Sequence, residues 1–448
     1  MKILIDNDKP SCSVAPNCQW SVWNDLIEVE DRHLVLFNTL SQTAVLMRKD
    51  EYVAIESLSQ DQAATLFRLG MLIPQDTDER EIVEKRFAEG KKDLSYLDLT
   101  ILLTQQCQFR CTYCFEGTKK DASLDEHTEN DIMEFLETQR PTLKKLRVTW
   151  FGGEPLIAYS RLKTLSQKLL DFCEKHQVSY AADMVTNGFA INEERCRELI
   201  DDLKVKRYII TLDGPASQHD RRRPLRNGLP TFGKIWKNID TLVQCGAQVN
   251  IRMTIDKENH EAIPTLLDAI ATGPFARKTG LSFCRTMDYD FTPENIKNVI
   301  FSEKEFADIE WSLIQHAHQL GLWSYRFPHC APLGGCLREG DIVIGTHGEI
   351  YKCLDTVGDE QWVSGHIGKD IWESRPDWYE RWLRWSPSQS ASCRQCVLQP
   401  LCNGGCPHNA LFRDKKHGTN LQCPDWKANY RQQIIELAKE IIHKNPIL

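Results

Sequence analysis

Three cysteines within one short segment carry the clearest chemical signal in this sequence. Cys107, Cys111 and Cys114 are separated by three and by two residues, and no fourth cysteine lies near them. Thiolates at these spacings can wrap around three corners of a four-iron, four-sulfur cubane. One iron would then have no protein ligand and could bind a substrate or cosubstrate. A structural zinc site is the alternative, although such sites use four ligands and this segment supplies three.

Further polar residues follow the strand-like segments that come later in the chain. Gly152, Gly153 and Glu154 end one such segment, and Asn187 and Thr211 lie at the ends of the next two. Glycine permits close backbone approach to a ligand, and a carboxylate can accept hydrogen bonds from an ammonium group. We therefore expect these residues to line the same site as the three cysteines.

The elements that must position these residues alternate regularly. Amphipathic helical patterns separate strand-like apolar runs at residues 97–103, 146–151, 181–186, 207–212, 249–255 and 281–285. Repeated strand, helix, strand units give right-handed crossovers and a parallel sheet, with functional groups at the carboxyl ends of its strands. The sequence therefore predicts an α/β fold with a partial (β/α)6, TIM-like barrel over residues 94–325.

The region before the barrel, residues 1–93, has a different pattern. Two apolar runs within residues 34–47 are separated by turn-like residues and predict a hairpin. Ser59 and Gln62 resemble a capping box that begins a short helix. Strands followed by a short helix predict a winged-helix-like module at residues 20–75, and a charged linker should join it to the barrel.

The region after the barrel, residues 326–448, is rich in cysteine and poor in apolar periodicity. Metal ligation would have to supply much of its stability. Eight thiolates suffice to close two further cubanes, whereas two zinc sites are the alternative, because spacing alone does not separate them. These eight residues are Cys330, Cys336, Cys353, Cys393, Cys396, Cys402, Cys406 and Cys423.

The composition narrows the class of protein. The 448 residues include 63 acidic and 55 basic ones, and a formal net charge of -8 gives no general reason to expect nucleic-acid binding. The sequence has no long uninterrupted apolar run and no pattern of a secretory signal. We expect a cytoplasmic protein with no membrane association, in which thiols stay reduced and free to bind metal.

The remaining cysteines give weaker signals. Cys173, Cys196, Cys245 and Cys284 fall within predicted barrel elements, where a free cysteine behaves as a small hydrophobic residue. The sequence assigns no role to a further pair before the first domain, Cys12 and Cys18.

These motifs together resemble a known family. The spacing Cys-x3-Cys-x2-Cys, with Tyr113 before the last cysteine, is similar to the signature of the radical S-adenosylmethionine (SAM) superfamily. The resemblance implies that SAM binds the open iron and is cleaved reductively to a 5'-deoxyadenosyl radical, which abstracts hydrogen. It also implies that Arg223 binds the SAM carboxylate, with Arg252 as a weaker candidate. The other implied SAM-binding residues are Gly152, Gly153, Glu154, Asn187 and Thr211.

The tail resembles the SPASM domain, named for peptide and sulfatase maturation enzymes. The resemblance implies three 4Fe-4S clusters in all, one that binds SAM and two auxiliary ones. The first auxiliary cluster would be held by Cys330, Cys336, Cys353 and Cys406. The second would be held by Cys393, Cys396, Cys402 and Cys423.

Three functions remain open at this point. The first is a maturase that installs a thioether or carbon-carbon crosslink in a ribosomally made precursor peptide. The second is an enzyme that converts a Cys or Ser of a sulfatase to formylglycine, and the third is a non-enzymatic iron-sulfur or zinc scaffold.

Two features favour the peptide maturase. The N-terminal module resembles the recognition element of such enzymes, whose sheet edge binds a leader peptide as an added strand. Sulfatase-type enzymes carry an aspartate directly after the third tail cysteine, whereas Leu354 follows Cys353 here and Asp355 is displaced by one residue. The expected partners are a precursor peptide with a leader sequence and an electron donor such as flavodoxin or ferredoxin.

Overall fold

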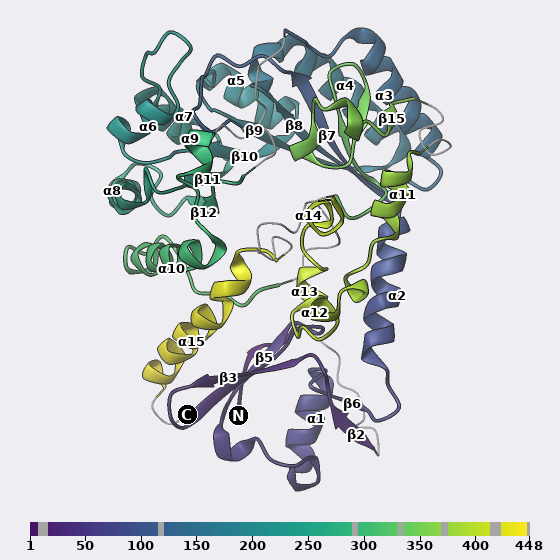
Figure 1. Cartoon of the computed structure of the whole chain (residues 1–448), viewed down its shortest axis with the longest axis vertical. Coiled ribbons are helices and arrows are strands. Elements are labelled where there is room, and N and C mark those ends of the chain that lie inside the picture. The colour runs from purple at the N-terminus through teal and green to yellow at the C-terminus, as the bar shows by residue number, and fades with distance from the viewer. Residues whose placement is uncertain are drawn as a thin grey trace. The chain divides into compact units, whose positions relative to one another are not determined.

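The computed structural model describes residues 1–7, 17–114, 121–288, 294–329, 333, 336–368, 375–412 and 423–445. Two cysteines discussed above lie outside these ranges: Cys12, which has no assigned role, and Cys330, a predicted cluster ligand. The chain divides into two compact units, each built from separate stretches. Unit 1 comprises Met1–Lys91, Ser324–Gly334 and Arg384–Leu448, and unit 2 comprises Lys92–Trp323 and Gly335–Leu383. Figure 1 labels the elements of both units in chain order.

Unit 2 contains a nine-stranded mixed sheet within its described part, in the order β12-β11-β10-β9-β8-β7-β13-β14-β15. Six consecutive strands of this sheet, from β7 to β12, run parallel, as predicted from the alternating pattern. Their bounds are β7 (Tyr96–Thr104), β8 (Lys145–Gly152), β9 (Ser179–Thr186), β10 (Val205–Thr211), β11 (Gln248–Ile255) and β12 (Thr279–Arg285). The α/β fold class is confirmed.

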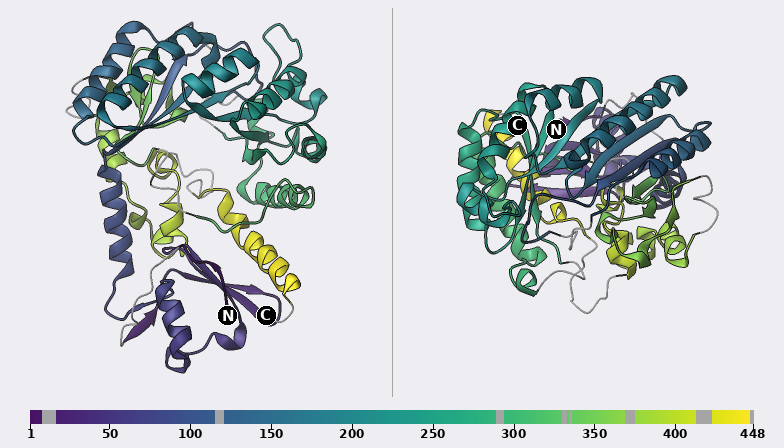
Figure 2. Two further views of the ribbon diagram at one scale, coloured as in Figure 1. Left: turned by 180° about the vertical axis from the view of Figure 1, so that it is seen from behind. Right: turned by 90° about the horizontal axis from the view of Figure 1, so that it is seen from above.

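The helices that follow these strands cover one face of the sheet (Figures 1 and 2). In α4, the residues Leu162, Leu165, Leu169 and Phe172 are buried at helical spacing and form the packed stripe. The bounds are α3 (Glu126–Gln139), α4 (Tyr159–His176), α5 (Glu193–Arg197), α6 (Ala216–Arg222), α7 (Phe232–Gln244), α8 (Ile263–Thr272), α9 (Glu294–Lys297) and α10 (Glu303–Gln319).

The other face of the parallel strands carries polar side chains. Along β11 every second residue is buried, while Asn250, Arg252 and Thr254 between them are partly exposed. Because side chains alternate across a strand, these three residues share the face opposite the helices. The sheet therefore presents chemistry on one face and packs its core on the other.

Part of the tail extends the same sheet. Strand β13 (Asp341–Ile344) pairs in parallel with β7, and β14 (Glu349–Tyr351) and β15 (Gly365–His366) follow it antiparallel. A further helix, α11 (Asp377–Arg384), follows them. These strands were not predicted, because each is too short to show a period of its own.

Unit 1 contains, in its described part, a four-stranded antiparallel sheet in the order β1-β5-β4-β3. The predicted hairpin is present as β4 and β5, and the capping box of Ser59 and Gln62 begins α1. The bounds are β1 (Lys2–Ile5), β2 (Cys18–Trp20), β3 (Asn24–Val29), β4 (His33–Asn38), β5 (Thr43–Arg48), α1 (Gln60–Arg68), β6 (Leu72–Pro74) and α2 (Glu79–Lys92).

Both faces of this small sheet are covered. Leu34 and Leu36 pack against α1, whereas Val35 and Phe37 pack against the C-terminal helix α15 (Trp426–Lys444) and residues of the tail. Two covered faces explain why β4 and β5 read as continuous apolar runs rather than as alternating ones. Figure 1 shows α15 beside β3 in unit 1, and Tyr430 of α15 donates a 2.8 Å hydrogen bond to Asp25 of β3.

The two units differ from the three domains expected from the sequence. The first boundary, at Lys91 and Lys92, falls close to residue 93, but the tail is divided between the units. Leu398 and Leu401 share a core with the N-terminal sheet, while Ile342 and Ile344 extend the barrel sheet. The remaining tail helices are α12 (Ala391–Arg394), α13 (Gln399–Cys402) and α14 (Pro407–Phe412). None of the described helices is long and apolar enough to cross a membrane.

Candidate active site

The carboxyl ends of the parallel strands of unit 2 surround a cavity of about 770 Å³. Eight of the nine residues that the sequence predicts for the SAM cluster and for SAM itself line this cavity: Cys107, Cys111, Cys114, Gly152, Gly153, Asn187, Thr211 and Arg223. The ninth, Glu154, does not line it and is fully buried. The parallel sheet thus brings together residues that are more than a hundred positions apart in sequence.

The cysteine segment directly follows β7 and is fixed to the segment after α6. The backbone N–H groups of Arg110 and Thr112 donate to the carbonyls of Pro224 and Arg222, at 2.9 and 3.0 Å. The amide of Asn187 lies 3.9 Å from the Cys107 sulfur and donates to it. If Cys107 holds a cluster, this donor would orient the ligand sulfur and influence the cluster.

The two glycines at the end of β8 are required by the cysteine segment itself. Gly152 has a φ of +123°, and a Cβ there would collide with the carbonyl oxygen of Thr104. A Cβ on Gly153 would collide with the carbonyl of Gln106. From the sequence, the two glycines predict close approach of the backbone to a ligand. In the structure they also allow close approach of the end of β8 to the cysteine segment.

Glu154 acts within the protein framework in this structure. Its carboxylate accepts hydrogen bonds from the N–H groups of Leu156 and Asn187, at 3.1 and 2.8 Å, and from the Thr186 hydroxyl at 2.7 Å. Burial raises the pKa of this carboxyl group, while the three hydrogen bonds oppose the shift. Glu154 therefore joins the ends of β8 and β9, and its expected contact with the SAM amino group stays a prediction.

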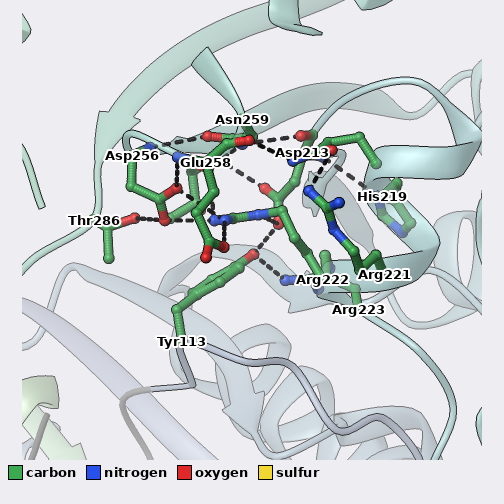
Figure 3. Close-up of polar contacts among 12 residues, drawn as sticks. Tyr113, Asp213, His219, Arg221, Arg222, Arg223, Asp256, Glu258, Asn259 and Thr286 are labelled. Carbon is green, nitrogen blue, oxygen red and sulfur yellow. Dashed lines mark hydrogen bonds and ion pairs between the residues drawn. The ribbon is translucent and has the colours of Figure 1, made fainter. Parts of the chain in front are cut away.

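The run of three arginines divides into different roles (Figure 3). Arg221 is exposed, whereas Arg222 is 1% exposed and donates two hydrogen bonds to the Asp256 carboxylate, at 2.9 and 2.8 Å. Arg223 lines the cavity, and its guanidinium donates a 2.7 Å hydrogen bond to the Tyr113 hydroxyl. Because Arg222 is already paired, Arg223 is the member of the run that can meet the SAM carboxylate.

Tyr113 links the cysteine segment to this charged group. Its hydroxyl donates to Asp213 at the end of β10 and accepts from Arg223, and the Arg222 guanidinium lies 4.8 Å from the centre of its ring. Burial raises the pKa of Tyr113 well above its ordinary value, so the hydroxyl keeps its proton and remains a donor. The sequence identified Tyr113 only as an aromatic residue of the signature.

His219 contacts Asp213, the residue that accepts the hydrogen bond from Tyr113. The backbone N–H of Asp213 donates to Nδ1 of His219 at 3.3 Å, which requires an unprotonated Nδ1. Burial lowers the pKa of His219 well below its ordinary value, and the nearby Arg223 and Arg222 charges act in the same direction. His219 is therefore a neutral acceptor rather than a general acid.

The electrostatic character of the cavity is cationic. Among the described residues that line it there is no Asp or Glu, but there are five arginines: Arg110, Arg223, Arg226, Arg252 and Arg285. Arg252 projects from β11 and makes no hydrogen bond or ion pair through its side chain with any residue that the structure describes. Arg252 is thus available to an anionic group, as Arg223 is.

The structure describes all four cysteines of the second predicted auxiliary site but only three of the first. Cys393, Cys396, Cys402 and Cys423 line one small cavity of about 40 Å³ in unit 1. Of the other set, Cys336 and Cys353 belong to unit 2 and Cys406 to unit 1, and Cys330 lies outside the described residues. No three His, Cys, Asp or Glu side chains in the described ranges are spaced to hold a single metal ion.

The residues of the barrel cavity fit an iron-sulfur cluster with a bound cosubstrate. Three thiols face one cavity with a guanidinium beside them, and this donor set suits a cluster with one open iron. Residues 101–270 of the chain match the Radical SAM superfamily. The protein carries a radical SAM domain. The predicted class of enzyme is confirmed.

Similar proteins agree with this assignment. The serine-type anaerobic sulfatase-maturating enzyme of Bacteroides thetaiotaomicron is 24% identical over 363 residues, which cover 71% of this chain and 84% of that protein. The cysteine-type anaerobic sulfatase-maturating enzyme of Clostridium novyi is 24% identical over 365 residues, covering 75% and 94%. At this identity the two relatives are similar proteins, and their named reaction is not assigned to this chain.

Two solved structures share the fold of the radical SAM chain. The structure of anSMEcpe with bound AdoMet and Kp18Cys peptide has a TM-score of 0.58 at 20% identity, covering 78% of this chain and 98% of that one. Streptococcus suis SuiB bound to precursor peptide SuiA has a TM-score of 0.51 at 14% identity, covering 89% and 97%. The fold of this chain is therefore similar to that of two proteins solved with a bound peptide, one with the Kp18Cys peptide and one with the precursor peptide SuiA.

Proposed function

We propose that this radical SAM enzyme modifies a ribosomally made precursor peptide and installs a thioether or carbon-carbon crosslink. The observation that carries the proposal is the environment of Leu354, which stands where sulfatase-type enzymes are expected to carry an aspartate. Formylglycine formation needs a base near the substrate, and this position offers an apolar side chain instead.

Leu354 packs into an apolar cluster beside the cavity. Its neighbours include Leu102 and Val343, which are buried, and Phe151 and Val185, which also line the cavity. An ionised carboxylate in this apolar position would lose its hydration without a partner. The wall of the cavity next to β13 is thus built to exclude water and charge rather than to remove a proton.

In the proposed reaction the chain's own residues have separate tasks. Cys107, Cys111 and Cys114 hold the cluster, and Arg223 orients the SAM carboxylate through its guanidinium. Reductive cleavage of bound SAM supplies a 5'-deoxyadenosyl radical that abstracts hydrogen. Phe151 and Val185 give the cavity wall an apolar surface, which would limit access of water to such a reactive species. The electron would come from a donor such as flavodoxin or ferredoxin.

The N-terminal sheet supports a peptide substrate. Among the described strands, β3 pairs on one side only, with β4, so its other edge has backbone groups that an added strand could pair with. Leu26 on this strand is an apolar side chain that is 41% exposed and that an added strand could cover. We infer that the leader of the precursor binds along β3.

Formylglycine formation is the second candidate, because the relatives named above by sequence are sulfatase-maturating enzymes. Asp355 belongs to the 3-10 helix η6 (Leu354–Thr356) and is partly exposed. If a small rearrangement of η6 directed Asp355 toward the cavity, this residue would supply the missing base. Asp355→Asn separates the two candidates, since it should abolish formylglycine formation and leave crosslinking largely unchanged.

The deciding experiment compares two substrates under anaerobic conditions. Short peptides encoded beside the gene are tested against a peptide carrying the Cys or Ser of a sulfatase, with SAM and a reductant. A crosslink appears as the loss of two hydrogen atoms and resists reaction with hydrazine, whereas formylglycine is an aldehyde that forms a hydrazone. Hydrazone formation on the sulfatase peptide, with no change in any precursor peptide, would overturn the proposal.

Recognition of the leader can be tested on the same peptide. Strand addition draws affinity from backbone hydrogen bonds, so a proline placed midway in the leader should weaken binding at least tenfold. A conservative side-chain exchange at the same position should change binding much less. Equal effects of the two exchanges would show that the leader does not bind as a strand.

A further inference from the structure

The cysteine set of unit 1 has a cationic neighbour that neither the sequence motifs nor the relatives point to. Lys427 lies in the first turn of α15 and lines the cavity that Cys393, Cys396, Cys402 and Cys423 surround. Its ammonium group lies 3.5 Å from the Cys423 sulfur and donates a hydrogen bond to it. Lysine side chains usually lie in solvent, so a partly buried ammonium group next to four thiols calls for an explanation.

The side chain of Lys427 is partly buried, and its amino group is the donor in the contact with the Cys423 sulfur. Thiols that bind metal do so as thiolates, so this contact would place a cationic donor beside negatively charged sulfur.

Packing holds Lys427 against the cysteines. Three and four residues further along the helix, Tyr430 and Arg431 bind Asp25 of β3, and Ile434 is buried in the core of unit 1. The loop on the other side of the cysteine set is anchored in the same core by Leu398 and Leu401. Both walls of the site therefore rest on one apolar cluster, which fixes the backbone of Lys427 relative to the cysteines.

A cluster closed by four thiolates carries a net negative charge, which increases by one when an electron enters. An ammonium group at hydrogen-bond distance stabilises the more negative state more strongly, because this attraction grows with the charge. Hydrogen bonds to ligand sulfur and local charge are among the factors that set cluster potentials. An ammonium group in this position would therefore raise the reduction potential.

We propose that Lys427 is a positioning residue for the second auxiliary cluster, and that its hydrogen bond to the ligand sulfur of Cys423 raises the reduction potential of that cluster. The inference rests on the proposed assignment of Cys393, Cys396, Cys402 and Cys423 as ligands. The redox step is the uptake of one electron by the cluster core, supplied by the reductant in the titration below. No proton or ligand is exchanged.

The test is a redox titration of the full-length, anaerobically reconstituted protein, followed by electron paramagnetic resonance. Lys427→Met removes charge and donor, Lys427→Gln removes the charge alone, and Lys427→Arg retains both. Lys439→Met is the matched control, because Lys439 lies on the same helix and contacts Glu436. The variant with alanine at Cys107, Cys111 and Cys114 identifies which signal belongs to the SAM cluster.

The expected result is a lower midpoint potential for one auxiliary signal in Lys427→Met. A tenfold weaker hold on the electron corresponds to about 59 mV for a one-electron couple. Lys427→Gln should show a smaller decrease, and Lys427→Arg and Lys439→Met should resemble the natural protein. If Lys427→Met does not load iron, the Gln variant decides the question.

Two results would overturn the proposal, and they are distinguishable. An unchanged potential in a Gln or Met variant with full iron content would mean that Lys427 has no influence on the cluster, while the assignment of the ligands would stand. If iron and zinc analysis shows that the four cysteines bind zinc or no metal, the assignment fails and the proposal fails with it. The radical SAM activity does not enter either result.

Discussion

The barrel cavity of unit 2 and the cysteine set of unit 1 gather the same kind of ligand by different means. In the cavity, the three cysteines stand in the loop after a parallel strand, and ladder hydrogen bonds fix that strand relative to its neighbours. In unit 1, the cysteines come from short helices and turns, whose places depend on the packing of Leu398, Leu401 and α15 on a small sheet.

This difference decides how each site should fail. A site at the ends of strands loses its function when a ligand is removed, yet the sheet remains. A site held by packing loses its geometry when the distant core is weakened, even if every ligand is present. The predictions below test this contrast from the largest expected effect to the smallest.

The largest effect is expected from removal of the cysteine ligands of the barrel. In the variant with alanine at Cys107, Cys111 and Cys114, 5'-deoxyadenosine formation should fall below detection. If all three proposed cubanes are loaded, iron content should fall by about four from about twelve atoms per chain, because each cubane holds four irons. Chromatographic detection of 5'-deoxyadenosine and iron analysis check this outcome. Continued formation of the product by this variant would contradict the assignment of the radical site.

The residues at the strand ends were predictable because two regularities act together. Alternating strand and helix patterns fix a parallel sheet, and a parallel sheet places the ends of its strands on one edge. Asn187 and Thr211 were found in this way, and both line the cavity. The surroundings of Glu154 were not predictable, because three donors from different segments occupy its carboxylate and no local pattern announces them.

The second prediction concerns the core under the cysteine set. Phe37 is fully buried in unit 1, and its ring lies 5.3 Å from that of Phe327. Phe37→Ala should cost about 3–5 kcal/mol through the cavity it leaves. Since the same core anchors Leu398, Leu401 and α15, the second auxiliary cluster should be lost faster to a chelator, while 5'-deoxyadenosine formation without peptide is largely retained.

A matched substitution serves as the control. Phe172→Ala on α4 removes an equally apolar side chain from the core of unit 2. It should destabilise the barrel and leave the cysteine set of unit 1 as stable to chelation as before. If both variants released iron from the same cluster at the same rate, packing would not distinguish the two sites.

The third prediction compares two neighbouring arginines in unit 2. Arg222→Ala leaves Asp256, and the more distant Asp213, without their buried partner, and breaking such a pair costs about 3–5 kcal/mol. Arg221→Ala removes an exposed side chain that bonds only Gln218 among the described residues, so its effect should stay within about 0.5 kcal/mol. Thermal unfolding under anaerobic conditions should therefore show a clear loss of Tm for Arg222→Ala alone.

The contact of Lys427 with Cys423 could not be predicted from the sequence. Lys427 is four residues beyond Cys423, where a helical pattern alone would place it on a solvated surface. Its contact with Cys423 exists because α15 is fixed by Asp25, about four hundred residues earlier. Sites that depend on such distant packing need the folded chain, whereas sites at strand ends can be read from local patterns.

The smallest effect is expected from Tyr113→Phe, which tests whether SAM binding depends on the hydrogen bonds that hold Arg223 in place. The exchange removes the hydroxyl that Asp213 and Arg223 share and keeps the ring and the three cysteines. A hydrogen bond of this kind contributes about 1 kcal/mol, so the Kd for SAM should rise roughly fivefold. Iron content should not change, because the Tyr113 hydroxyl bonds Asp213 and Arg223 and the exchange keeps all three cysteines.

The control for this exchange is another buried tyrosine of the barrel. The Tyr208 hydroxyl is buried and has no hydrogen-bond partner among the described residues, so Tyr208→Phe should leave SAM binding unchanged. Equilibrium binding of SAM to both reconstituted variants provides the measurement. If Tyr113→Phe bound SAM as tightly as Tyr208→Phe, Arg223 would be held in place without the hydroxyl. The orientation of the SAM carboxylate would then depend on the strand ends alone, which is the simplest form of the contrast between the two sites.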